Sequence, residues 1–272
     1  MTRTTANSDF PAALMRWRKI RRLSQLELAL TADVSQRHIS WLETGRSEPS
    51  REMVLRLSDA MLIPLRNRNE LLTAAGFARY YKENELSEPV MESVLDVLHI
   101  ILDNHQPYPA MVIDRFWNIK IQNDAAQMLF SISGDSDELW QGIGSGDKKN
   151  LALLSIHPNG LRQYIRNFGQ IIGPFLRRLQ REANESSDAE LMAQFSRFQE
   201  LLTDIDLAMI LDKQNSDLIP IIPLEIEVQG TLLKLFSVVS SFGTVQDITA
   251  EELRIETLFP ADEQTKQFFK HG

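Results

Sequence analysis

Residues 24–50, SQLELALTADVSQRHISWLETGRSEPS, indicate two short helices joined by a tight turn. Ser24 and Ser35 each stand where an N-cap is expected, and Glu27 follows Ser24 by three residues, as a capping box requires. We expect the turn at Asp33. Two helices joined in this way have the form of a DNA-reading helix-turn-helix.

The spacing of apolar residues assigns a buried side to each of the two helices. Residues three or four apart share one face of a helix, so recurring apolar residues mark the inward side. Capped amphipathic helices also occur in many helical proteins, and this pattern alone is therefore weak support for DNA binding. The residues expected to face inward are Leu26, Leu28, Ala29 and Leu30 in the first helix and Val34, Ile39 and Leu42 around the second.

The opposite face of the second helix carries side chains suited to reading DNA. A recognition helix reaches base edges in the major groove with residues near its N-terminus. Glutamine pairs with adenine edges and arginine with guanine edges, so Gln36 and Arg37 are the expected reading residues. Trp41 either lies exposed near DNA or closes the edge of the core. The full set of expected DNA-binding residues is Gln25, Gln36, Arg37, His38, Ser40, Trp41 and Arg46.

Three more helices are expected around this motif, which gives an all-α domain of five helices over residues 1–82. Gly45 suits a left-handed C-cap after the second motif helix. The further helices are predicted at 11–21, at 51–62 with Ser50 as its cap, and at 66–77. The first of them has a basic face, which either contacts phosphates or is solvated, formed by Arg16, Arg18, Lys19, Arg21 and Arg22.

Charge separates the two parts of the chain. The 272 residues carry a net charge of −8, but residues 1–82 carry +6 and residues 83–272 carry −14. A basic domain joined to an acidic one is expected of a DNA-binding module attached to a body that avoids DNA. Cysteine is absent, which excludes disulfides, thiolate catalysis and cysteine-based zinc sites. With no signal peptide or apolar run of membrane-spanning length, a cytoplasmic location is expected.

The second part is predicted to be an α+β domain at 107–272, preceded by a connector helix within 83–106. Glu88 and Pro89 begin the connector, which packs on this domain or on a partner copy through a stripe of Val90, Val94, Leu98 and Ile101 or Leu102. Strands are expected at 111–114, 117–122, 224–228 and 231–239, and helices at 123–130, 161–184 and 189–204. The helix at 161–184 is either continuous or bent or split at Gly169, Gly173 and Pro174.

Three stretches resemble one known family. VSQRHISWLETGRSEPSR (34–51) resembles the XRE-type helix-turn-helix of MmyB-like regulators, which supports phosphate contacts by Gln25 and Arg46. YPAMVIDRFWNIKIQNDAAQMLF (108–130) and FGTVQDITAEELRIETLFPADEQT (242–265) resemble their ligand-binding domain. The resemblance implies a PAS-like antiparallel sheet with helices over one face, and a pocket for fatty-acid-like molecules. The chain departs at 167–169, where Asn-Phe-Gly stands in place of Asn-Trp-Glu.

A pocket of this kind needs apolar walls and a few polar groups. The same apolar residues also suit a plain core, and the resemblance favours the pocket interpretation. Arg162 is the expected partner of an anionic end, because a guanidinium forks well onto a carboxylate. The expected ligand-binding residues are Met111, Ile113, Trp117, Met128, Arg162, Phe168, Ile172, Phe175 and Phe236.

Catalytic and metal sites have no support in the sequence. The five histidines lack metal-site spacing, and the glycines of 142–147 match neither a dinucleotide nor a P-loop fingerprint. We therefore expect a regulator, not an enzyme, that binds double-stranded operator DNA, has no cofactor other than a bound fatty acid as effector, and forms a homodimer. The alternatives are a second domain that only dimerises, a DNA-tethered enzyme, and a haem or flavin sensor.

Overall fold

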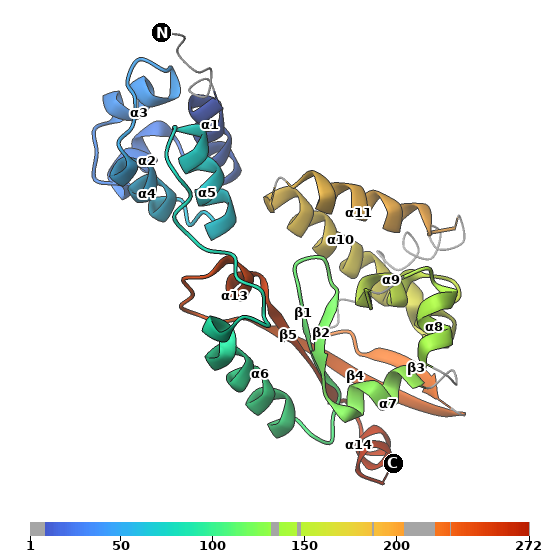
Figure 1. Ribbon diagram of the computed structural model, residues 1–272. Helices are drawn as coiled ribbons and strands as arrows, with labels where there is room; N and C mark the ends of the chain where they lie inside the picture. The colour runs from blue at the N-terminus through green and yellow to red at the C-terminus, as the bar shows by residue number, and fades with distance from the viewer. Residues whose placement is uncertain are drawn as a thin grey trace. The chain divides into compact units, whose positions relative to one another are not determined.

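The computed structural model describes residues 9–131, 136–145, 148–186, 188–203, 221–228 and 230–271 (Figure 1). Two compact units divide the chain. The first comprises Met1–Glu85 and Thr244–Glu251, and the second comprises Leu86–Gly243 and Glu252–Gly272. The chain therefore passes between the units three times: after Glu85, where the second unit begins, and on either side of the inserted segment Thr244–Glu251, which belongs to the first unit.

The first unit contains the five predicted helices. Their apolar faces form one core, in which Leu14, Trp17, Ile39, Leu42 and Leu57 have at most 1 % of their surface exposed. The helices are α1 Asp9–Ile20, α2 Gln25–Thr31, α3 Gln36–Glu43, α4 Arg51–Ala60 and α5 Leu65–Ala74.

The predicted caps of the motif are confirmed. The Ser24 hydroxyl accepts a hydrogen bond from the Glu27 amide at 3.1 Å, and the Glu27 carboxylate accepts one from the Ser24 amide at 2.7 Å. Ser35 caps α3 through the amide of His38. Asp33 in the turn has φ of 52°, and Gly45 after α3 has φ of 70°, so both adopt the left-handed conformation that ends a helix.

The predicted buried side of α2 was too wide. Leu28 and Ala29 are buried, but Leu26 is 51 % exposed and Leu30 is 73 % exposed. Helical residues two apart do not share a face, so Leu26 points away from Leu28. Two turns of helix therefore contact the core through a narrow stripe only.

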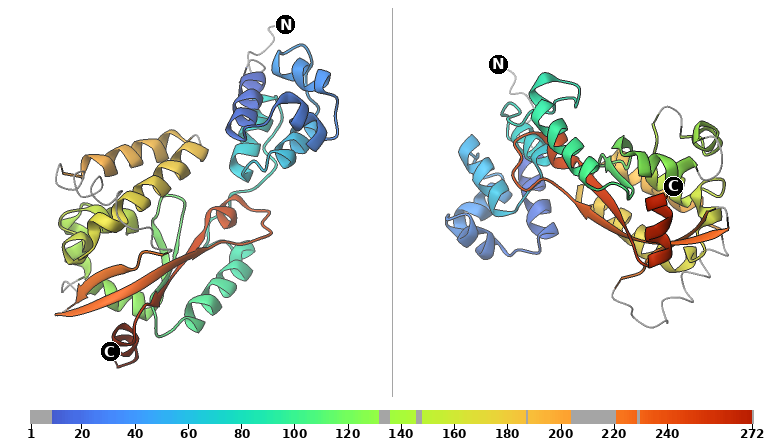
Figure 2. Two further views of the ribbon diagram at one scale, coloured as in Figure 1. Left: turned by 180° about the vertical axis from the view of Figure 1, so that it is seen from behind. Right: turned by 90° about the horizontal axis from the view of Figure 1, so that it is seen from below.

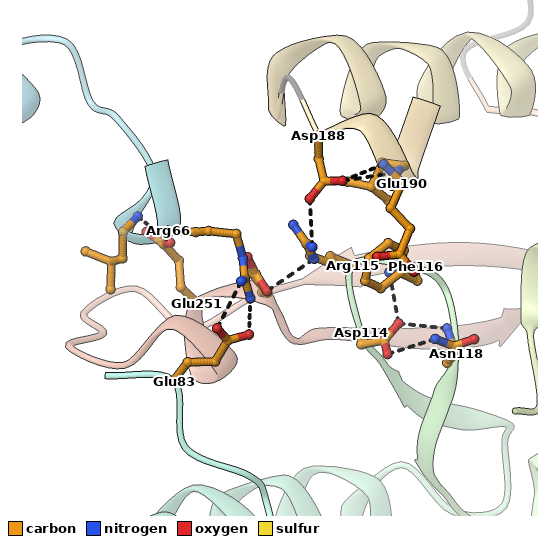
Figure 3. Close-up of polar contacts among 12 residues, drawn as sticks. Arg66, Glu83, Asp114, Arg115, Phe116, Asn118, Asp188, Glu190 and Glu251 are labelled. Atoms are coloured by element: carbon orange, nitrogen blue, oxygen red, sulfur yellow. Dashed lines mark hydrogen bonds and ion pairs between the residues drawn. The ribbon is translucent and has the colours of Figure 1, made fainter. Parts of the chain in front are cut away.

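A segment from the far end of the chain completes the first unit. α13 spans Ile248–Glu252, and its Glu251 carboxylate accepts a hydrogen bond from the Leu65 amide at 2.7 Å (Figure 3). This carboxylate caps α5, whose own N-cap residue, Pro64, makes no side-chain cap. Asp247 accepts hydrogen bonds from the backbone and side-chain amides of Asn84. The sequence did not predict this contact.

The second unit is built on one antiparallel sheet, which confirms the predicted α+β class. Its strand order is β2-β1-β5-β4-β3, and β5 was not predicted. In the sheet register, Met111 lies opposite Glu256, and Ser237 lies opposite Leu258. The strands are β1 Ala110–Ile113, β2 Ile119–Gln122, β3 Leu224–Val228, β4 Thr231–Ser240 and β5 Arg254–Pro260.

Helices lie on both faces of this sheet, whereas the resemblance implied only one covered face (Figure 2). On one face, Leu98 and Leu102 of α6 pack against Ala110, Val112 and Ile255. The other face packs against the helices between β2 and β3. The helices of this unit are η2 Pro89–Met91, α6 Glu92–Asn104, α7 Asp124–Phe130, α8 Ser136–Gly142, α9 Leu151–Ile156, η4 Leu161–Tyr164, α10 Phe168–Ser186, α11 Ala189–Glu200 and α14 Glu263–His271.

Two helix predictions in this unit need correction. Val90 does not belong to the buried stripe of the connector, because it lies in η2 and is 64 % exposed, while Met91 beside it is buried. The segment predicted as a helix at 161–184 is divided between η4 and α10, and the break lies before Phe168 and not at Gly169, Gly173 or Pro174, all of which lie within α10. Between η4 and α10 the backbone pairs with β3: Ile165 forms a β-bridge with Ile226, and the Arg166 amide donates a hydrogen bond to the Glu225 carbonyl.

Candidate functional sites: an exposed helix face and an apolar cavity

The exposed face of α3 carries the residues expected to read DNA. Gln36 and Arg37 are exposed at its start, and His38 and Ser40 are half-buried. Trp41 is 37 % exposed and lies outside the core, and the Arg37 guanidinium stacks over its ring at 4.5 Å. This stacking holds a cation and an aromatic surface together on one face.

Gln25 and Arg46 flank this face in different ways. Arg46 follows α3 and is exposed. The Gln25 amide nitrogen donates a hydrogen bond to the Glu43 carboxylate at 2.8 Å, which fixes the side chain at the start of α2. An amide nitrogen has two hydrogens, and this bond uses one of them.

A buried ion pair ties α1 to α3 behind the exposed face. The Arg18 guanidinium donates two hydrogen bonds to Glu43, at 2.5 and 2.9 Å, and the Glu43 side chain has no exposed surface. Burial opposes ionisation of Glu43, but hydrogen bonds from Arg18 and Gln25 and the attraction of Arg18 hold its pKa below the usual value. Two parallel bonds also fix the relative geometry of the two helices.

The predicted basic face of α1 is therefore only partly available to phosphates. Arg18 is occupied by Glu43, and Arg21 donates hydrogen bonds to the carbonyls of Met61 and Leu62 at 2.8 Å each. Both side chains act within the fold, which sequence spacing could not reveal because their partners are distant in the chain. The exposed members of this face are Arg16, Lys19 and Arg22.

An apolar cavity of about 340 Å³ lies within the second unit, between the sheet and the helices that come between β2 and β3 in the chain. Five of the residues predicted to bind a ligand line it: Met111, Trp117, Phe168, Ile172 and Phe175. They come from β1, the turn after it, and α10. Further apolar lining comes from Phe130, Leu151, Leu224, Ile226 and Leu235.

The other four predicted residues lie outside this lining. Side chains alternate along a strand, and because Leu235 and Ser237 line the cavity, Phe236 belongs to the other face. Ile113 is fully buried in the core, and Met128 packs against that core. The Arg162 guanidinium stacks over the Phe168 ring at 4.7 Å instead of entering the cavity.

Trp117 enters the cavity from a left-handed backbone conformation, with φ of 68°. Such a conformation is rare for a bulky residue and marks sites where the surroundings impose it. Asp114 supports the turn by accepting hydrogen bonds from the amides of Phe116 and Asn118 (Figure 3). The Trp117 ring meets Phe175 edge to face at 5.0 Å.

The turn that carries Trp117 is also anchored by charge. Arg115 pairs with Asp188 at 2.8 Å and with Glu252 at 3.6 Å (Figure 3). Asp188 is the N-cap of α11. Its pKa lies below the usual value because backbone hydrogen bonds from α11 and the Arg115 charge outweigh the effect of burial. This cluster fixes the β1–β2 turn beside α11.

Sequence reasoning missed the polar part of the cavity wall. Ser155, Arg178, Ser237 and Glu256 contribute polar groups to the lining. A signal for Arg178 was present, because it continues the helical spacing of Phe168, Ile171 and Phe175 along α10. The strand β5 was not predicted, so nothing could place Glu256.

Two further kinds of feature, a metal site and a membrane-spanning helix, are not found among the described residues. The described residues contain no group of three histidine or acidic side chains that could hold a metal ion. No helix in the described ranges is both long enough and apolar enough to cross a bilayer. Part of the glycine-rich stretch, 146–147, lies outside the described residues.

Comparison with known families accounts for both units. The helix-turn-helix family model matches residues 14–66. The model of the MmyB-like transcription regulator ligand binding domain matches residues 94–271. A helix-turn-helix joined to such a domain defines a DNA-binding transcription regulator with a ligand-binding domain.

The second match spans more than half of the chain, so the protein belongs to the MmyB-like transcription regulators. Both matched families are of regulator type and not of enzyme type. No curated protein matches the chain.

Proposed function

We propose that this regulator responds to a small apolar effector, of the fatty-acid-like kind, bound in the cavity of its second unit. The observation that carries the proposal is the 340 Å³ cavity with predominantly apolar walls. Apolar walls with a few polar groups suit an elongated amphipathic ligand. A domain that served only to dimerise would be expected to fill its interior with side chains.

For the first unit, the proposal assigns roles by position on the exposed face. Gln36 and Arg37 read base edges, and Trp41 lies against the DNA. Gln25, His38, Ser40 and Arg46 position the domain on the phosphate backbone or groove edge. The exposure of Gln36, Arg37, Trp41 and Arg46 supports the assignment, as does the net charge of +6 on residues 1–82.

The effector must favour one DNA-binding state over another, because a ligand with equal affinity for both shifts nothing. Two covalent paths serve this coupling. One is the connector before α6, and the other is the inserted segment Thr244–Glu251. The segment follows β4 and precedes β5, and these strands contribute Ser237 and Glu256 to the cavity wall. Movement of either strand would be passed to the cap of α5.

A homodimer in the cytoplasm completes the proposal. Dimeric helix-turn-helix proteins read two half-sites about 34 Å apart, or a multiple of that distance. Exposed apolar residues on α6 and the adjoining strands support a self-association surface: Val97, Ile100, Val238 and Phe259 are 42–57 % exposed. PAS-like character is supported by the single antiparallel sheet with its helices inserted between β2 and β3.

Thermal melts of the delipidated chain with a panel of saturated and unsaturated fatty acids test the effector proposal. An acid at 100 times its dissociation constant should stabilise the second unit by about 2.7 kcal/mol. Extraction and mass spectrometry of the protein as purified should recover a molecule of the same class. If no acid shifts the melt and no apolar molecule is extracted, the dimerisation-only alternative replaces this proposal.

A further inference from the structure

One part of the cavity wall gathers polar groups within otherwise apolar surroundings. Arg178 of α10, Ser237 of β4 and Glu256 of β5 all belong to the lining. Ser237 is exposed and 32 % of the Arg178 side chain is exposed, so this part of the wall is open to solvent, whereas Oε2 of Glu256 is buried. A polar group taken out of water is costly unless it is hydrogen-bonded, so this buried oxygen needs a partner.

Among the described residues, only one of the two carboxyl oxygens of Glu256 has a hydrogen-bond partner. The Ser237 hydroxyl donates a hydrogen bond to Oε1 at 2.6 Å. Oε2 is buried and has no hydrogen-bond partner among the described residues. Burial raises the pKa of Glu256, as does the nearby Glu182 charge, whereas the Ser237 bond and Arg178 oppose that rise. A protonated Glu256 presents a donor, which requires an acceptor.

Arg178 is also only partly engaged. Its Nε donates to Glu182 at 2.9 Å, and its guanidinium lies over the Trp117 ring at 4.7 Å. Within the described part of the chain, its two terminal nitrogens make no hydrogen bond. Glu182 is shared, because it also pairs with Arg254 at 2.7 Å and accepts from the Trp117 indole at 3.0 Å.

The local charges leave a net positive site when Glu256 is neutral. Two cations, Arg178 and Arg254, then face one carboxylate, Glu182. The pKa of Glu182 lies below its usual value, because the attraction of Arg254 and hydrogen bonds from Trp117 and Arg178 outweigh burial. An anion with acceptor oxygens balances this positive charge, accepts hydrogen bonds from the terminal nitrogens of Arg178, and gives the buried Oε2 of protonated Glu256 a partner.

We propose that Arg178, Glu256 and Ser237 form the head-group subsite of the cavity, and that it binds the carboxylate of an amphipathic effector. One carboxylate oxygen accepts from the terminal nitrogens of Arg178, and the other accepts from protonated Glu256. Arg162, which sequence reasoning assigned to this role, does not line the cavity; its guanidinium stacks over the ring of Phe168, which does. This inference rests on the effector proposal and specifies the ligand's polar end.

The subsite makes effector binding depend on pH in a defined direction. Above the raised pKa of Glu256, its carboxyl loses the proton that it donates and becomes a second anion beside the ligand carboxylate. Affinity for a carboxylate should therefore fall as pH rises through that range. Glu256→Gln keeps a neutral donor at every pH, so this variant should bind with affinity nearly independent of pH.

The test measures binding of dodecanoate, 1-dodecanol and methyl dodecanoate to the full chain by calorimetry. Arg178→Gln should weaken dodecanoate binding at least tenfold and leave dodecanol binding within twofold. The matched control is Arg177→Gln, which removes the same charge from an exposed position one residue away and should change neither. Retained dodecanol binding also shows that the Arg178→Gln cavity is folded.

The possible outcomes separate the two proposals. If the wild-type chain binds all three compounds equally, and Arg178→Gln behaves like Arg177→Gln, the subsite is overturned while the apolar cavity proposal stands. If wild-type affinity for dodecanoate does not fall with rising pH, the role of Glu256 is overturned. If none of the three compounds binds, the effector proposal itself fails, and the subsite fails with it.

Discussion

Glu43→Gln should lower the free energy of unfolding of the first unit by about 3 kcal/mol or more. Removing one member of a buried ion pair leaves the other charge without compensation, and typical costs are about 3–5 kcal/mol. Glu43 has no exposed side-chain surface, and Arg18 has 13 %. Hydrogen exchange of α1 and α3 peptides in the full chain should report the loss.

The matched control for this change is Glu52→Gln. Glu52 and Arg56 form an i,i+4 pair of the same chemistry, with 83 % and 44 % of their side-chain surfaces exposed. Exposed pairs of this kind contribute about 0.3–0.5 kcal/mol. An equal effect of the two substitutions would show that the Arg18–Glu43 pair does not hold α1 to α3.

The same pair predicts the acid sensitivity of the first unit. The pKa of Glu43 is lower in the folded chain than its ordinary value of 4.5. The stabilisation is therefore complete above that ordinary pKa and is lost as pH falls through the folded value. Wild-type α1 and α3 should lose protection in this range more steeply than the same helices in Glu43→Gln.

Gln36→Ala and Arg37→Ala should each weaken binding to the cognate operator by about 1–3 kcal/mol and affect random DNA much less. Both side chains are exposed at the start of α3, where a recognition helix meets base edges. Fluorescence anisotropy with an operator selected from random double-stranded DNA provides the measurement. Equal losses on operator and random DNA would remove these residues from the reading role.

Arg46→Ala is the control for base reading, because a phosphate contact carries no sequence information. It should weaken binding to both kinds of DNA alike. The slope of log affinity against log salt concentration should become shallower by about one. An unchanged slope would contradict the phosphate contact.

Local sequence signals predicted the first unit well. Capping residues such as Ser24 and Ser35 act on amides three residues away, so their pattern is visible within a few positions. The Arg18–Glu43 pair spans 25 positions and has no such local signal. The exposure of Leu26 and Leu30 likewise depends on how narrow the contact of α2 with the core is.

The second unit was less predictable because its pairings are more distant. β5 follows α13 and pairs between β1 and β4, so its place depends on strands far away in the chain. Without β5, the alternation that brings Glu256 to the cavity wall could not be recognised. Phe168 and Phe175 of α10 were predicted from their apolar aromatic character and the family resemblance, and the structure places both in the cavity wall.

Occupancy of the cavity is proposed to control DNA affinity. The direct test measures the affinity of the delipidated full chain for operator DNA with and without saturating dodecanoate. We predict that dodecanoate changes the affinity for operator at least fivefold. Because coupling is reciprocal, bound operator should change the affinity for dodecanoate by the same factor. Glu251→Ala, which removes the carboxylate cap of α5, should reduce this factor without altering dodecanoate affinity in the absence of DNA. Bound dodecanoate that leaves operator affinity within twofold would contradict the claim.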